Sequence, residues 1–134
     1  MLWNRSYETG VEEIDKQNFD LISRLNAMTT SDTNRARFEQ LVNFEQIVPK
    51  YFEREQTMQN ECNYYDTDLH RYAHAGYLKH LRRITRNFID GGPTLENEMF
   101  FLKNAVEFLK KHIMKEDRAF AEFYKTNIIN AKAQ

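Results

Sequence analysis

Two histidines, His70 and His74, stand four residues apart in a stretch whose apolar residues repeat every three or four positions. On an α-helix this spacing stacks the two imidazoles one turn apart on the same face, so both rings can point at one metal ion. A histidine pair on an apolar face can also be a hydrogen-bonded feature of the core. The pair therefore indicates either a metal site or a buried polar contact, and the other inward-facing residues must distinguish the two.

Further polar residues fall on the inward faces of the neighbouring helical patterns. Glu55 lies on an apolar stripe, where an unpaired carboxylate would cost several kcal/mol, so it must be protonated, paired with a cation or bound to metal. His112 joins the core face of the last pattern, and Asn18 and Tyr51 interrupt the first two. Asp117 follows His112 by five residues, about 140° around an ideal α-helix, so both can reach one ion only through distortion or a bridging role.

The convergence of three histidines and two carboxylates in one core predicts a metal centre. Packing alone does not explain why so many ionisable groups share one depth, because each of them loses its hydration there. The alternative is a buried polar network closed by tyrosine hydroxyls and backbone carbonyls.

Four amphipathic patterns must position these residues. Apolar residues three and four positions apart run over residues 14–28, 38–62, 70–88 and 95–120. Residues 29–32 offer N-caps for the second helix, and Pro49 predicts a bend within that helix. Residues 90–93 should end the third helix. His80 lies about 120° from the stripe of His74, so we expect an exposed side chain without function.

Short connections between these helices predict an all-α, antiparallel up-down-up-down four-helix bundle, formed by a single domain over residues 1–134. Residues 1–11 should form an N-terminal arm with an anchor at Trp3 and a turn at Gly10, and residues 125–134 a polar tail. Glycine and proline are too scarce for a turn-rich β fold.

Composition excludes several classes of protein. With 19 basic and 20 acidic residues, nothing attracts a nucleic acid backbone or an anionic membrane. The single Cys62 cannot form an internal disulfide, and four histidines with one cysteine exclude a thiolate zinc module. The absence of a long apolar run or a signal-like N-terminus predicts a soluble, cytoplasmic protein.

From Trp3 to about Tyr124 the chain resembles a bacteriohemerythrin, the non-haem di-iron oxygen-binding bundle. The motifs that carry the resemblance are Val11-Glu-Glu-Ile-Asp-Lys-Gln-Asn18, Tyr51-Phe-Glu-Arg-Glu55, the pair His70 and His74, and His112-Ile-Met-Lys-Glu-Asp117. The resemblance implies that His70, His74 and His112 hold one iron. It further implies that Glu55 and Asp117 bridge this iron to a second one.

Two positions depart from the family pattern, since Asn18 and Tyr51 stand where the family has the histidines of the second iron. In the family this second iron is where dioxygen binds. Asparagine is a weak neutral ligand, and tyrosine binds a metal only after losing its proton. We therefore expect a mononuclear centre, with Tyr51 and Asn18 filling the second position by hydrogen bonds to each other or through water to Glu55 and Asp117. The alternative is a Tyr51 phenolate bound to ferric iron.

Three imidazoles with one or two carboxylates suit iron or manganese at five or six coordination, whereas zinc more readily takes three histidines and a water. We expect one or two irons per chain, with manganese or zinc as competitors. The first hypothesis for function is a hemerythrin-like iron protein that binds dioxygen or nitric oxide, or senses redox state. The alternatives are a mononuclear iron enzyme with a ligand set like that of superoxide dismutases or dioxygenases, and a metal-free bundle that contacts another protein of unknown identity.

Overall fold

The computed structural model describes residues 3–31, 33–91 and 94–130. Within these residues all regular structure is helical, as the sequence predicts, and strands are absent. The four long helices are α1 (Glu12–Thr29), α2 (Asn34–Glu61), α3 (Thr67–Gly91) and α4 (Leu95–His112). Shorter helical segments are η1 (Arg5–Tyr7), η2 (Ile113–Asp117), α5 (Arg118–Tyr124) and η3 (Lys125–Ile129).

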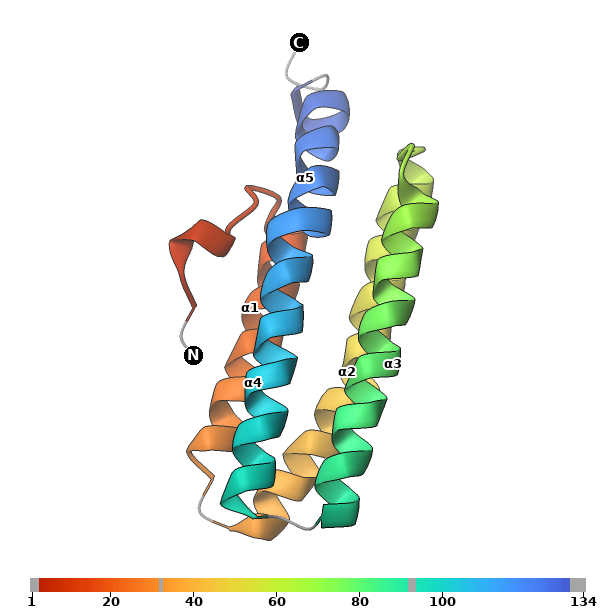
Figure 1. Ribbon diagram of the computed structural model, residues 1–134. Coiled ribbons are helices and arrows are strands. Elements are labelled where there is room, and N and C mark those ends of the chain that lie inside the picture. Colours follow the sequence, from red (N-terminus) through yellow and green to blue (C-terminus); the bar gives the residue numbers. More distant parts are fainter. Residues whose placement is uncertain (1–2, 32, 92–93, 131–134) are drawn as a thin grey trace.

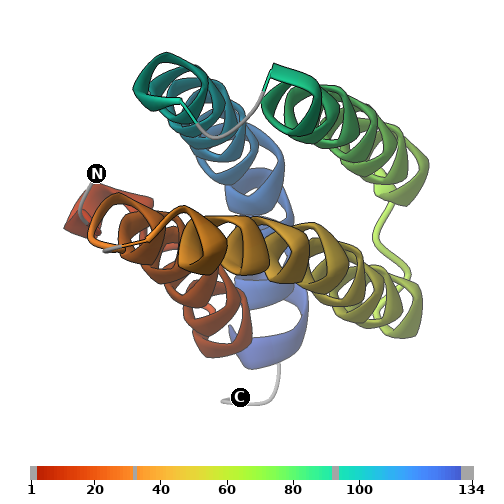
Figure 2. The ribbon, with the colours of Figure 1, turned by 90° about the horizontal axis from the view of Figure 1, so that it is seen from below.

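The long helices pack around one core. α1 contacts α2, α2 contacts α3, α3 contacts α4 and α4 contacts α1, which closes a ring of four helices. Figure 1 shows the four long helices running alongside one another, and Figure 2 shows them surrounding a common centre. The apolar stripes that the sequence predicts fill this centre, including the fully buried residues Leu21, Leu25, Phe44, Val48, Leu81, Leu109 and Ile113.

The chain before α1 turns at Gly10, whose φ of 89° lies in the left-handed region that favours glycine. The carboxylate of Asp15 in the first turn of α1 accepts hydrogen bonds from the backbone N–H and the hydroxyl of Thr9, at 2.8 and 2.7 Å. Trp3 packs edge-on against Tyr7, with ring centroids 5.5 Å apart. The predicted turn at Gly10 is therefore confirmed, and Asp15 joins this segment to α1.

The structure departs from the predicted α2 at its beginning. The N-cap is Thr33, whose hydroxyl accepts the Ala36 N–H at 3.1 Å, whereas we expected a cap within residues 29–32, of which Asp32 lies outside the described residues. α2 then runs through Pro49 as one helix. Proline has no N–H to donate to the helix at that turn. The contacts of α2 with α1 on one side and α3 on the other keep the helix continuous there.

Two residues on the predicted apolar stripes are exposed, because they lie near the end of the bundle farthest from α5. Phe38 retains 42% of its exposure and Met99 retains 62%. The third helix extends to Gly91, and the Gly92 and Pro93 of its expected stop lie outside the described residues.

The C-terminal part of the chain is more helical than expected. Residues 125–129, predicted as the start of a polar tail, form the π-helical η3, which continues α5 (Figure 1). Phe120 and Ala121 of α5 are buried against Val11, Ile14 and Tyr64. This apolar anchor holds α5 in place, so the polar residues after it extend an existing helix; residues 131–134 lie outside the described part.

Among the helices of the described residues, none combines the length and the apolar character needed to cross a bilayer.

Candidate metal centre

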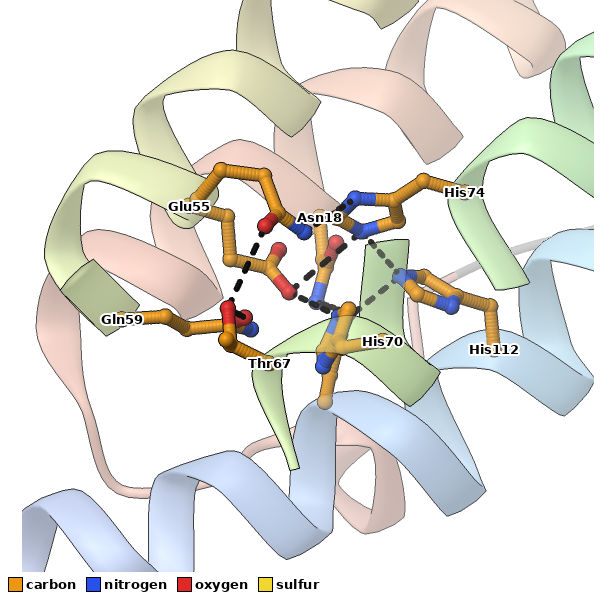
Figure 3. A network of polar contacts seen from close by, with 9 residues as sticks. Asn18, Glu55, Gln59, Thr67, His70, His74 and His112 are labelled. Carbon is orange, nitrogen blue, oxygen red and sulfur yellow. Dashed lines mark hydrogen bonds and ion pairs between the residues drawn. The ribbon is translucent and has the colours of Figure 1, made fainter. Parts of the chain in front are cut away.

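Four of the helical elements bring five ionisable side chains to one point in the core. α2 supplies Glu55, α3 supplies His70 and His74, α4 supplies His112, and η2 supplies Asp117. Each of the five is at most 5% exposed, and each offers one ligand atom within 4.8 Å of the others. Figure 3 shows Glu55 of α2, His70 and His74 of α3, and His112 of α4 pointing toward one another.

A π-helical turn aligns His112 with Asp117. The five residues of η2 follow α4 directly, and the Arg118 N–H reaches back to the carbonyl of Ile113, five residues earlier. In an α-helix the two side chains would diverge, but the wider π turn places residues five apart on one face. His112 Nε2 consequently lies 2.8 Å from Asp117 Oδ1. The sequence predicted that this spacing requires a distortion, and η2 is that distortion.

The distances within the cluster resemble those between neighbouring ligands of one ion. Two ligand atoms that are each about 2.1 Å from a metal and 90° apart lie about 3.0 Å from each other. His74 Nε2 and His112 Nε2 are 3.1 Å apart, and His70 Nε2 is 3.2 Å from Asp117 Oδ1. Glu55 Oε1 contacts His70 Nε2 directly and lies 3.6 Å from His74 Nε2. The donor atoms therefore surround one point rather than forming a chain.

The chemistry of these donors also fits a cation. Two imidazole nitrogens that face each other at 3.1 Å can form a hydrogen bond only if one carries a proton, whereas both are lone-pair donors toward a metal. Glu55 Oε1, His70 Nε2 and Asp117 Oδ1 are buried, and among the described residues their polar contacts are with one another and with the other histidines of the cluster. Such a closed set needs either shared protons or a bound cation, and a metal ion could satisfy all three atoms at once.

Without metal, protons and ion pairs must stabilise the same cluster. Burial lowers the pKa of His70, but the carboxylates of Asp117 and Glu55 outweigh it and raise this pKa to about 9. Burial raises the pKa of Glu55 to about 7, with a further contribution from the charge of Asp117. Burial and the neighbouring His112 and His70 lower the pKa of His74 to about 2. A metal-free cluster therefore holds protons at neutral pH that a metal ion would displace.

Asp117 is the ionised partner of this cluster. Burial opposes its charge, yet His112 and His70 together hold the pKa of Asp117 well below its ordinary value. The pKa of His112 is raised in return, since Asp117 outweighs the effect of burial. The amide of Asn18 donates to the second oxygen, Asp117 Oδ2, at 3.0 Å. Asn18 thus faces the centre, as the sequence predicted, and contacts a carboxylate directly.

Tyr51 lies elsewhere, and our expectation that it fills the second metal position is wrong. It is only half-buried, and its hydroxyl donates to Asp20 of α1. Asp20 is held by Arg24 at 2.9 Å, one turn away. The long phenol reaches a charged acceptor at the rim of the bundle. Burial and Asp20 raise the pKa of Tyr51, which favours the protonated phenol over a phenolate ligand.

Residues that the sequence did not single out support His74. Its ring stacks on Phe52, with centroids 3.9 Å apart and planes within 3° of parallel. Gln56 Nε2 lies 3.1 Å from His74 Nδ1. The hydroxyl of Thr67 lies 3.3 Å from Gln56 Oε1 and donates to the fully buried Gln59 at 2.8 Å. This amide network lies directly beside His74, and only the position of Gln56 next to Glu55 indicated it in the sequence.

His80 was expected to be exposed, and this expectation is wrong. The imidazole is half-buried and stacks on Phe108 of α4, with centroids 3.8 Å apart. A helical projection of α3 alone does not include this neighbour on α4. The ring does not take part in the five-residue cluster.

Comparisons with models of protein families, with curated proteins and with solved structures each found no match.

Proposed function

We propose that this protein is a hemerythrin-like, non-haem iron protein that binds dioxygen or nitric oxide, or responds to an oxidant, at a mononuclear centre. The observation that carries the proposal is the convergence of five buried ligand atoms within 4.8 Å. The described bundle is compatible with an antiparallel up-down-up-down arrangement and a packed N-terminal arm, which are the fold expected for such a protein. The free thiol of Cys62 is compatible with a reducing compartment such as the cytoplasm.

A single iron follows from the two replaced positions. Asn18 already donates to Asp117, and the phenol of Tyr51 is engaged by Asp20 at the rim. The ligands left for a second cation would therefore be only carboxylate oxygens, and the first site already uses those carboxylates. Three imidazoles and the two carboxylates remain for one ion, a set that suits iron at five or six coordination.

Iron held there would supply one-electron redox chemistry and a coordination position for a small ligand. The chain's own groups would orient and isolate it. Asn18 fixes the orientation of Asp117 through Oδ2 and leaves Oδ1 toward the imidazoles, while Phe52 and Gln56 fix the ring of His74. The apolar residues around the cluster exclude bulk water, which strengthens each electrostatic interaction within it.

Nitric oxide provides a direct test of this function. Metal-free protein is loaded with ferrous iron under anaerobic conditions, and the EPR spectrum is recorded before and after adding nitric oxide. We expect a new signal that accounts for about one spin centre per chain in the wild type and in His80→Ala, and its loss in His74→Ala. Iron that binds without any response to nitric oxide would contradict gas binding and favour the redox alternatives, including a mononuclear iron enzyme.

A metal-free bundle is the second candidate, because one set of contacts favours it. His112 and His70 lie 2.8 and 3.2 Å from Asp117, so protonated imidazoles can neutralise the buried carboxylate without metal. In that case ferrous iron would not bind stoichiometrically, and chelators would leave the thermal stability unchanged.

A further inference from the structure

A pocket of about 430 Å³ lies between α3 and α4, with His112 among its lining residues. Its apolar part includes Gly76, Tyr77 and Phe108, and Phe108 is further covered by the stacked ring of His80. Small-molecule sites have this size and this mixture of an apolar surface with a few polar groups. The pocket is therefore large enough for an organic molecule of one or two rings.

Charged residues give the pocket a preference for anions. Lys79, Arg83 and Lys111 line it, against a single acidic residue, Glu116. None of these four takes part in an ion pair recorded among the described residues. The excess of positive charge remains available to a ligand, and the cations stand beside an aromatic surface.

We propose that the pocket between α3 and α4 is a binding site for a small aromatic carboxylate. The carboxylate pairs with the cations of Lys111 and Arg83, and the ring lies against Phe108 and Tyr77. Binding requires no metal, since these four residues are not among the proposed metal ligands, so this site is separable from the proposed iron centre.

The test measures binding of 2-naphthoate to the full chain by isothermal titration calorimetry, before and after metal removal. Its neutral analogue 2-naphthamide has nearly the same shape and no charge. We expect the naphthoate to bind at least about tenfold more tightly than the amide, because charge-assisted hydrogen bonds are about twice as strong as neutral ones. Equal affinities would overturn the proposal, since the pocket would then be an apolar gap without selectivity for anions.

Variants of one glycine locate the site. A Cβ built at Gly76 meets no atom within 4 Å, so a side chain there enters open space without displacing the helix. Gly76→Phe should abolish naphthoate binding, whereas Gly76→Ala should retain it with an unchanged or higher melting temperature. Naphthoate binding that survives Gly76→Phe in a folded protein would overturn the assignment of this pocket.

A pair of charge variants tests the role of the cations. Lys111→Gln should weaken naphthoate binding several-fold and leave binding of the amide unchanged. Lys103→Gln removes the same charge from an exposed position of α4 outside the pocket and serves as the control. Equal effects of the two variants would show that only net charge matters, which contradicts a defined site.

Discussion

Metal loading of the centre should release protons. At neutral pH the metal-free cluster holds one proton on His70, whose pKa is about 9, and about half a proton on Glu55, whose pKa is about 7. His112 holds a further fraction, since its pKa is raised. A metal ion needs neutral imidazoles and ionised carboxylates, so these protons must leave when it binds.

The magnitude follows from the pKa values of His70 and Glu55. At pH 7 we expect about 1.5 protons from His70 and Glu55 together, and up to about one more from His112. Deprotonating His70 two pH units below its pKa of about 9 costs about 3 kcal/mol. The apparent metal affinity should therefore rise at least about tenfold per pH unit between pH 7 and 8, and less steeply as pH approaches 9, where His70 is already half deprotonated.

The stability of the metal-free protein should change in the opposite direction. The folded state holds the His70 proton more tightly than the unfolded chain does, so this proton stabilises the folded protein. The stabilisation is fully present below about pH 6.5 and is lost as pH rises through about 9. Glu55 adds to the same trend between about pH 4.5 and 7. The melting temperature of the metal-free protein should thus be lower at pH 9 than at pH 6, and metal loading should remove most of this difference.

The assay is calorimetric titration of the metal-free protein with zinc, a redox-inert probe, in two buffers of different ionisation enthalpy at pH 7. The difference in apparent enthalpy gives the number of protons released. Glu55→Gln should release at least about half a proton fewer, since Glu55 also helps to raise the pKa of His70. Release of less than about half a proton by the wild type would refute the reasoning, because the imidazole of His70 would then be neutral before metal binds.

Three further predictions concern residues next to the cluster. Tyr51→Phe should leave the metal content unchanged in elemental analysis. It should lower the free energy of unfolding by about 1 kcal/mol in thermal melting, because the hydrogen bond to Asp20 is lost. A lower iron content, or the loss of a phenolate colour, would contradict this prediction. Gln56→Leu should weaken metal affinity about tenfold or more in a competition titration, because His74 Nδ1 loses its partner. Gln56→Glu should retain the affinity, since a carboxylate can accept from the same nitrogen. Equal affinities of the wild type and both variants would show that Gln56 does not position His74. Asn18→His combined with Tyr51→His should raise the metal content from one to two per chain, and a content of one under the same loading would show that the replaced histidines are not what removes the second site.

Periodicity in the sequence was sufficient to predict the helices and their inward faces. Apolar residues at steps of three and four can be buried only along one stripe of a helix, so polar residues on that stripe had to enter the core. Glu55, His70, His74, His112 and Asp117 accordingly lie together in the structure. The five-residue spacing of His112 and Asp117 also required a local distortion, although the sequence did not specify a π turn.

Contacts between helices account for what the sequence could not predict. A helical projection shows which face a side chain leaves from, but not where a long side chain ends or what the neighbouring helix offers. The phenol of Tyr51 therefore reaches Asp20 rather than Asn18, and His80 stacks on Phe108 of α4. Gln56 lies beside the predicted stripe, so its contact with His74 depends on how α2 and α3 pack together.

The metal content of the purified protein tests the central claim most directly. The wild type, His74→Ala and His80→Ala are expressed in iron-supplied cells, and iron and competing metals are measured per chain by elemental analysis. We predict one iron in the wild type and in His80→Ala, and little or none in His74→Ala, since an incomplete ligand set binds poorly. Absence of stoichiometric metal from the wild type, or undiminished metal in His74→Ala, would contradict the metal centre, and two irons per chain would contradict its mononuclear form.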